Sequence, residues 1–195
     1  FKEVHVKVFN TGKLEIPGIK DSSILTQTFS LLVNELQPFI DSPLIVVRDS
    51  VDTVLINSNF TCNYYIERSK LHQILKKKYN MISMFDPCSY PGIQCRFFYN
   101  KNKTVQDGVC TCSTKCNKKG CGSGEGQCIE ISFMIFRTGS VLIVGHCDEN
   151  ILHIIYKFIK NILETEFHEI NNGLVGPSDK KEKVKKVRTK KIIIS

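Results

Sequence analysis

Five cysteines lie close together in the second half of this 195-residue chain, and thiols at such spacing could hold a metal ion. They are Cys110, Cys112, Cys116, Cys121 and Cys128, in the pattern C-x-C-x3-C-x4-C-x6-C. Four of these thiolates could bind a structural Zn²⁺, which would order a segment too rich in glycine to hold itself. The spacing differs from paired C-x2-C knuckles, so disulfides and free thiols stay open as alternatives. We expect that no cofactor is required, and a structural zinc is one of these open alternatives.

The pattern of side chains does not indicate a catalytic site. No nucleophile next to a base, no carboxylate cluster and no glycine-rich phosphate loop stands out along the chain. We therefore predict that the protein is not an enzyme. An accessory role beside a catalytic domain placed upstream ranks last among the hypotheses.

The positive charge is concentrated at the carboxyl end. Residues 171–195 hold eight Lys or Arg against Asp179 and Glu182, so they supply +6 of the formal net charge of +8. We interpret 171–195 as a flexible basic tail. It is a solvated segment, a source of sequence-independent attraction to phosphates, or a nuclear address, and the sequence does not separate these three.

The elements that must position any site come from an internal repeat. Residues 130–163 recur 127 positions earlier, at residues 3–36, with eleven identities over 34 positions and no gap. The identical pairs are Glu3/Glu130, Phe9/Phe136, Thr11/Thr138, Gly12/Gly139, Ile16/Ile143, Gly18/Gly145, Asp21/Asp148, Ile24/Ile151, Leu25/Leu152, Asn34/Asn161 and Leu36/Leu163. One unit has been duplicated.

Each copy of the repeat predicts a strand, a turn, a second strand and a helix. In the second copy Ile131, Phe133 and Ile135 alternate with other residues, a Gly-containing turn follows, and Asp148 is placed to cap an amphipathic helix. These three positions should face the helix. The opposite face carries Met134, Phe136, Leu142 and Val144. It is too apolar to face only water and needs a partner.

The remaining segments complete an α+β pattern. We predict a hairpin over 2–9 and 14–16 with a helix over 22–36, a long strand over 53–66, a helix over 68–79, and strands over 81–85 and 93–99. The predicted organisation is a partial first repeat over 1–40, a connector over 41–52, and a second repeat over 53–170 interrupted by a cysteine-rich insertion over 100–127. No apolar run is long enough for a transmembrane helix, and no signal peptide is visible.

Three local motifs resemble those of the TATA-box-binding protein (TBP) family. Residues 6–18 (VKVFNTGKLEIPG) and 133–145 (FMIFRTGSVLIVG) look like the two hairpin motifs of that family, and residues 85–93 (FDPCSYPGI) look like its proline-kinked loop. The likeness spans residues 3–167 without the insertion. Its divergence and its extra cysteine-rich loop make it most similar to the TBP-like proteins of large nucleocytoplasmic DNA viruses.

The resemblance implies a pseudo-two-fold saddle. In such a saddle a curved antiparallel sheet presses its concave face into the minor groove of AT-rich DNA, and helices lie on the convex face. Apolar side chains enter between base steps and unstack them, so that the bent groove buries more of the sheet.

Individual residues match the DNA contacts of the family. Phe9 and Phe136 match its wedge phenylalanines, and Tyr90 stands where the kinked loop offers another wedge. Asn57, or Asn59 if the alignment slips, matches an asparagine that donates to base edges, and Arg96 matches an arginine that reaches a phosphate. Met134, Leu142 and Val144 complete the predicted DNA-binding set. A fourth wedge and a first-repeat asparagine are expected upstream of Phe1.

Each of these assignments has a plainer alternative. The aromatic residues could be ordinary strand or loop aromatics, Asn57 could bond locally, and Arg96 could be solvated or paired with an acid.

Several positions depart from the family pattern. Pro17 and Val144 replace threonines that touch the groove floor, and Lys7 replaces an apolar contact residue. Glu15 places a carboxylate on the face that should meet DNA, which is costly beside phosphates. We therefore expect altered or weak TATA preference, with the second repeat binding more firmly than the first.

The resemblance favours a general transcription initiation factor that binds and bends promoter DNA. Its expected partners are double-stranded DNA and a TFIIB-like factor or RNA polymerase, with no membrane. The alternative is a degenerate scaffold of the viral transcription machinery that no longer bends DNA. The expected location is the host cytoplasm, in a viral factory, or the nucleus, with packaging in the virion as a further expectation.

Overall fold

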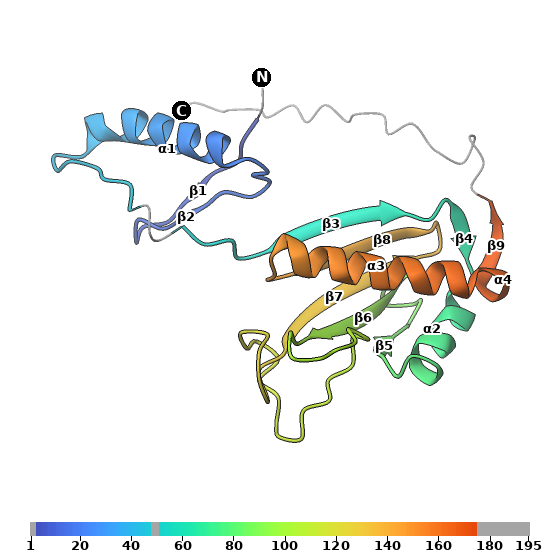
Figure 1. Cartoon of the computed structure of the whole chain (residues 1–195). Helices are drawn as coiled ribbons and strands as arrows, with labels where there is room; N and C mark the ends of the chain where they lie inside the picture. The colour runs from blue at the N-terminus through green and yellow to red at the C-terminus, as the bar shows by residue number, and fades with distance from the viewer. Residues whose placement is uncertain (1–2, 48–50, 175–195) are drawn as a thin grey trace. The chain divides into compact units, whose positions relative to one another are not determined.

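A computed structural model describes residues 3–47 and 51–174, which divide into two compact units. The first unit ends at Asp52 and the second begins at Thr53. Figure 1 shows the elements of both units. Each unit is described by itself.

The first unit consists of a short hairpin and one long helix. Strands β1 (Lys7–Val8) and β2 (Leu14–Glu15) precede helix α1 (Ser22–Leu36) and a 3-10 turn η1 (Gln37–Phe39). The helix has the bounds predicted from the sequence, because the Asp21 side chain accepts a hydrogen bond from the backbone of Ser23 and so caps its first turn. The hairpin is shorter than predicted. Of the described residues of this unit only Thr28 is buried, and the apolar stripe of its helix keeps part of its surface exposed.

The second unit is built on a five-stranded antiparallel sheet. The strands are β3 (Ile56–Thr61), β5 (Ile82–Met84), β6 (Gly92–Tyr99), β7 (Ile129–Phe136) and β8 (Ser140–Gly145). They are ordered β3-β8-β7-β6-β5. A separate two-stranded ladder joins β4 (Tyr64–Ile66) to β9 (Asn171–Leu174).

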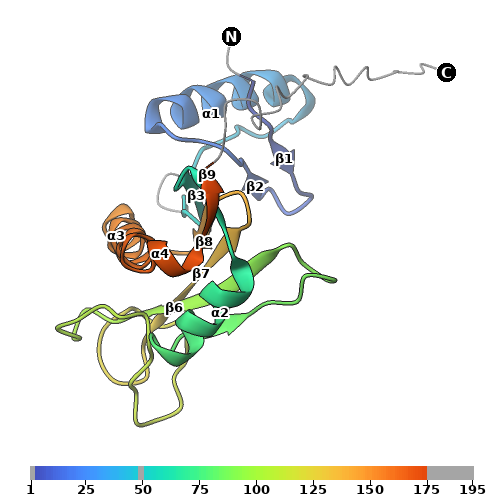
Figure 2. The same ribbon diagram turned by 90° about the vertical axis from the view of Figure 1, so that its right-hand side faces the viewer.

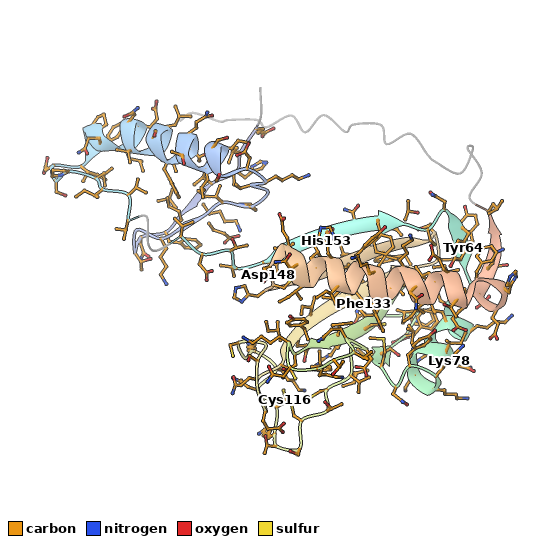
Figure 3. The ribbon with its side chains drawn as sticks, in the orientation of Figure 1. Tyr64, Lys78, Cys116, Phe133, Asp148 and His153 are labelled. Atoms are coloured by element: carbon orange, nitrogen blue, oxygen red, sulfur yellow. The ribbon has the colours of Figure 1, made fainter. Side chains whose placement is uncertain are left out.

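The described part of this unit contains three helices, each of which contributes side chains to one core. Helix α3 (Glu149–Thr165) lies along the sheet (Figure 1), and helix α4 (Phe167–Ile170) connects it to β9 (Figure 2). Helix α2 (Arg68–Lys77) contributes Leu71 and Leu75 to the same core. Figure 3 labels Phe133 of β7 beneath α3. Ile131, Phe133 and Ile135 have no exposed surface, so the face predicted to meet the helix is confirmed.

The internal repeat extends to backbone register. Lys7 pairs with Glu15 and Val8 with Leu14 in the first unit, and the residues 127 positions later pair identically, Met134 with Leu142 and Ile135 with Val141. Gly12 and Gly139 close the two turns with φ of 78° and 77°. Asp148 caps α3 by accepting a hydrogen bond from Ile151, as Asp21 caps α1. The two copies therefore share strand pairing, turn and cap as well as sequence.

The predicted long strand over 53–66 is wrong in two respects. It begins only at Ile56. It breaks at Cys62 and Asn63, where Asn63 adopts a positive φ of 61° and β4 turns away from the sheet. The β7–β8 turn forces this break, because Gly139 packs so closely on the Tyr64 carbonyl that a Cβ would collide with it, and its own carbonyl accepts from the backbone of Cys62. Alternation of side chains continues across the break, so the sequence pattern does not reveal it.

The predicted tail is also corrected at its start. Residues 171–174 form β9, in which Leu174 pairs with Tyr64 and Asn171 with Ile66. The rest of the predicted basic tail, residues 175–195, lies outside the described residues.

The α+β class, the curved antiparallel sheet and the covering helices agree with the predicted fold. None of the helices in residues 3–47 and 51–174 has the length and apolar character needed to cross a membrane.

Candidate nucleic-acid interface

The sheet face opposite α3 carries two aligned rows of side chains, all of them at least partly exposed among the described residues. The pairing register places one row across all five strands as Asn57, Val144, Ser132, Arg96 and Ile82. The second row is Asn59, Leu142, Met134, Gln94 and Met84. Five of the eight predicted DNA-binding residues therefore share one face. We call it the open face.

The open face is apolar at its centre and at one edge. Leu142, Met134 and Val144 are only partly exposed, whereas Ile82 and Met84 of the edge strand are 55% and 63% exposed. Sequence reasoning missed Ile82, Met84, Gln94 and Ser132. The period-two pattern of 81–85 and 93–99 carried the signal, because Met81, Ile93, Cys95 and Phe97 are the buried partners in that alternation.

Both asparagines considered from the sequence lie at the β3 end of the rows. Asn57 is opposite Val144 and Asn59 is opposite Leu142, and both are exposed. Each places an amide group beside an apolar side chain, an arrangement that suits hydrogen bonding to base edges next to an apolar contact.

Two of the predicted wedge residues form one aromatic pair. The ring centroids of Tyr90 and Phe136 are 5.9 Å apart with the planes tilted by 55°. Gly92 lies directly opposite Phe136 in the ladder, and a Cβ at Gly92 would come within 3.0 Å of both rings. The rings of Tyr90 and Phe136 can approach each other this closely because Gly92 has no side chain. Gly92 thus shapes the candidate site, and sequence reasoning did not include it among the site residues.

The kinked loop that carries Tyr90 is held by Asp86. Its carboxylate accepts hydrogen bonds from the Ser89 hydroxyl at 2.7 Å and from the backbone of Cys88 at 3.1 Å, and its carbonyl accepts from the backbone of Tyr90. The bonds from Ser89 and then Cys88 lower the pKa of Asp86. The loop is therefore fixed by its own side chains.

Arg96 is paired with an acid. Its Nη1 lies 3.1 Å from Oε1 of Glu130, on the strand next to it. The acid-paired alternative raised from the sequence is thus the arrangement in the structure. To contact a DNA phosphate, the Arg96 guanidinium would have to bind it together with Glu130 or in place of Glu130. The phosphate contact of Arg96 stays a prediction.

The first unit replaces the apolar centre by an ion pair. Lys7 Nζ lies 2.8 Å from Glu15 Oε1, and these residues occupy the register positions of Met134 and Leu142. The Glu15 carboxylate is thus balanced by Lys7. Phe9, the predicted wedge of this unit, follows β1 and is 46% exposed.

The cysteine cluster lies away from these rows, at the entrance to β7. The Sγ atoms of Cys110, Cys112, Cys116 and Cys128 all lie within 4.8 Å of one another. Cys121 was included in the predicted set, but it is exposed and lies outside this group, with its thiol directed at the carbonyl of Ser123. The predicted ligand set is corrected to four residues.

Comparison with known proteins agrees with the resemblance seen in the motifs. No protein-family model matches the chain. A curated protein of Acanthamoeba polyphaga mimivirus, described as TATA-box-binding protein-like, is 26% identical over 181 residues, which cover 86% of this chain. The chain spans 44% of the length of that relative. The match confirms the similarity to a divergent viral TBP-like protein.

Proposed function

We propose that this chain is a TBP-like transcription initiation factor that binds and bends AT-rich promoter DNA through the minor groove. The observation that carries the proposal is the open face, where Leu142 and Met134 form an apolar centre between the amides of Asn59 and Gln94. An apolar surface with amide groups at its sides suits the minor groove, whose floor offers hydrogen-bond acceptors at A·T pairs.

Bending is assigned to the aromatic pair at the end of the open face. Phe136 and Tyr90 would enter a base step together, since their ring centroids are 5.9 Å apart. Unstacking a step costs a few kcal/mol, which the newly buried apolar surface of the sheet offsets. In this proposal the two units form the two halves of a saddle with α1 and α3 on its convex side.

The convex helices would recruit a TFIIB-like factor or RNA polymerase, and the protein itself would catalyse no reaction. It would act where viral promoters are transcribed, in a cytoplasmic viral factory or in the nucleus.

Fluorescence transfer across a doubly labelled AT-rich duplex tests the proposal. Phe136→Ala should abolish the bend and weaken binding about tenfold, which corresponds to about 1.4 kcal/mol. Tyr156→Ala is the matched control, because Tyr156 is an aromatic residue of α3 on the helix side. A chain that ends at Leu174 separates attraction by residues 175–195 from binding by the sheet. Binding that depends only on those residues, or a bend unchanged in Phe136→Ala, would overturn the proposal.

The second candidate is a scaffold that keeps the fold without bending DNA. The two ion pairs favour it, because Lys7–Glu15 occupies an apolar position of the repeat and Glu130 neutralises Arg96. If the protein is a scaffold, a TFIIB-like factor or polymerase should bind it in the absence of DNA. The Phe136→Ala variant should bind that partner as tightly as the unaltered chain does.

A further inference from the structure

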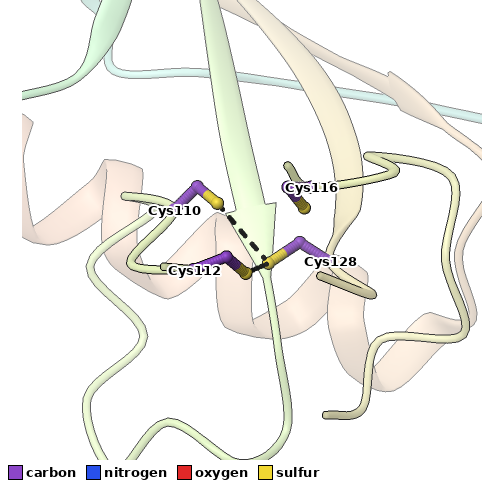
Figure 4. A group of neighbouring side chains, drawn as sticks. All are labelled: Cys110, Cys112, Cys116 and Cys128. Atoms are coloured by element: carbon purple, nitrogen blue, oxygen red, sulfur yellow. Dashed lines mark hydrogen bonds between the residues drawn. The ribbon is translucent and has the colours of Figure 1, made fainter. Parts of the chain in front are cut away.

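The cysteine cluster has the dimensions of a single tetrahedral metal site. Zinc–sulfur bonds of about 2.3 Å at a tetrahedral centre place the sulfurs about 3.8 Å apart. The Sγ of Cys128 lies 3.5 Å from that of Cys112 and 3.9 Å from that of Cys110, and all four sulfurs lie within 4.8 Å of one another. Figure 4 shows Cys110 and Cys112 directed at Cys128, with Cys116 beside them. The cluster needs little adjustment to enclose one ion.

Other uses of four thiols fit this geometry less well. A disulfide has a sulfur–sulfur bond of about 2.05 Å and joins cysteines two by two, whereas here Cys128 is about equally close to two partners. An iron–sulfur cluster interposes several irons and sulfides, so its thiolates lie farther apart than those around one ion. One soft divalent ion is therefore favoured.

Neighbouring groups already donate hydrogen bonds to the sulfurs. The backbone N–H of Gly126 donates to Cys112 at 3.3 Å, and the Asn100 amide donates to Cys128 at 3.7 Å. Asn100 is buried, and its amide also donates to the carbonyl of Gly124 at 2.7 Å. Such donors stabilise negative charge on metal-bound thiolates and orient them.

The insertion is not held together by an apolar core. Among the described residues, no apolar side chain between 101 and 127 belongs to the buried core. The segment is fixed instead by backbone hydrogen bonds, such as Glu130 N–H to Lys118 at 2.7 Å, and by polar side chains, such as the Lys103–Asp107 ion pair at 2.6 Å and the bond from the Ser113 hydroxyl to Glu125 at 3.0 Å. In a segment without a core, metal binding supplies folding free energy directly.

We propose that Cys110, Cys112, Cys116 and Cys128 bind one structural Zn²⁺ that fastens the insertion to the start of β7. Cys128 directly precedes β7 and is 1% exposed, so it anchors the ion to the sheet, while the other three ligands bring the insertion to it. Binding displaces the thiol protons to solvent and involves no redox step. All four positions are protein thiolates, so the site is closed and non-catalytic.

The full chain, purified without chelator under reducing conditions, tests this proposal by elemental analysis. We expect about one zinc per chain. Cys112→Ser and Cys116→Ser should each lower the zinc content at least fivefold, whereas Cys121→Ser, a matched change in the same insertion, should leave it unchanged. Replacement of zinc by Co²⁺ should give the visible absorption of a tetrahedral tetrathiolate.

Limited proteolysis reports on the insertion independently of metal content. Chelation should expose residues 101–127 to cleavage while the circular dichroism of the sheet and helices persists, and added Zn²⁺ should restore protection. The proposal would be overturned if the reduced protein contained no stoichiometric zinc, or if Cys121→Ser lost as much zinc as Cys112→Ser and Cys116→Ser. It would also be overturned if chelator left the protection of residues 101–127 from proteolysis unchanged. A variant that fails to fold cannot mimic the result, because the chelation experiment uses the unaltered chain.

Discussion

Gly92 decides how closely the two rings of the candidate wedge can approach. A Cβ there would lie 3.0 Å from ring atoms of both Tyr90 and Phe136, which is tighter than ordinary packing. We expect Gly92→Ala to push the rings apart and to lower the free energy of unfolding by about 1–3 kcal/mol. The same change should reduce the bending of an AT-rich duplex.

A double-mutant cycle separates ring crowding from other effects of Gly92→Ala. Without the Tyr90 ring, the Phe136 ring has room to move away from the added methyl group. Gly92→Ala should therefore lower the free energy of unfolding in urea by clearly less in a Tyr90→Ala background than in the unaltered chain. Equal costs in both backgrounds would mean that the rings do not set the penalty.

Glu166 forms a buried polar centre between α3, α4 and the end of α2. Its carboxylate is 4% exposed and accepts hydrogen bonds from Lys78 at 2.7 Å and Tyr79 at 2.6 Å. The bond from Lys78 and then that from Tyr79 lower the pKa of Glu166. Burial, and after it Glu166, raises the pKa of Tyr79 to about 12.

The lowered pKa of Glu166 makes its contribution to stability depend on pH. A carboxyl group with a lowered folded-state pKa stabilises the fold above its unfolded pKa of about 4.3, and that stability is lost as pH falls through the folded-state value. Glu166→Gln should therefore cost about 1.5–3 kcal/mol at pH 7, and less as the pH falls below about 4. Urea unfolding at both pH values measures the difference.

Glu164→Gln is the control for this pH dependence. Glu164 is 65% exposed and lies 3.5 Å from Lys160, so its loss should change the unfolding free energy by less than about 1 kcal/mol. A penalty in Glu166→Gln that stays constant across the acid range would contradict the argument.

The sequence predicted the strands and helices whose apolar residues recur with strong periodicity. It did not predict strand ends that depend on contacts with distant parts of the chain. Helix α1 was predicted with its observed bounds because Asp21 caps a regular apolar stripe. The break at Cys62 and Asn63 was missed, since it depends on Gly139, more than 70 residues away. Four convergent cysteines followed from composition, whereas the exclusion of Cys121 depends on how the insertion folds.

Strand β9 is the element whose contribution is easiest to isolate. Strand β9 pairs with β4. The hydrogen bond from Glu67 N–H to the Ile170 carbonyl and the buried side chain of Ile170 both lie before β9, so a chain that ends at Ile170 keeps them. A chain that ends at Ile170 should lose about 1–2 kcal/mol of unfolding free energy relative to one that ends at Leu174. Hydrogen exchange should accelerate at Tyr64, which pairs with Leu174, and change little at Ile66, whose N–H donates to the Arg137 carbonyl. Identical stability of the two chains would show that β9 contributes nothing.

In the described chain as a whole, the apolar core belongs to one of the two units. Every fully buried apolar side chain within residues 3–47 and 51–174 lies between Tyr64 and Ile170. The first unit has a two-pair hairpin and one helix, which leave Val8, Phe9, Leu31 and Phe39 between 46% and 85% exposed. Small hairpins without a third strand or a well-packed helix are marginal in water. The two units therefore differ in how far each can fold alone.

We expect residues 53–174 to unfold cooperatively by themselves, and residues 3–47 alone to show little stable structure. Comparison with the full chain then bears on the proposed saddle. If the two units share apolar surface, the full chain should be more stable than residues 53–174, by about 25 cal/mol for each Å² that they bury together. Equal denaturation midpoints would mean that the units do not pack on each other without DNA. The duplex would then have to assemble the saddle, and DNA binding should raise the midpoint of the full chain more than that of residues 53–174.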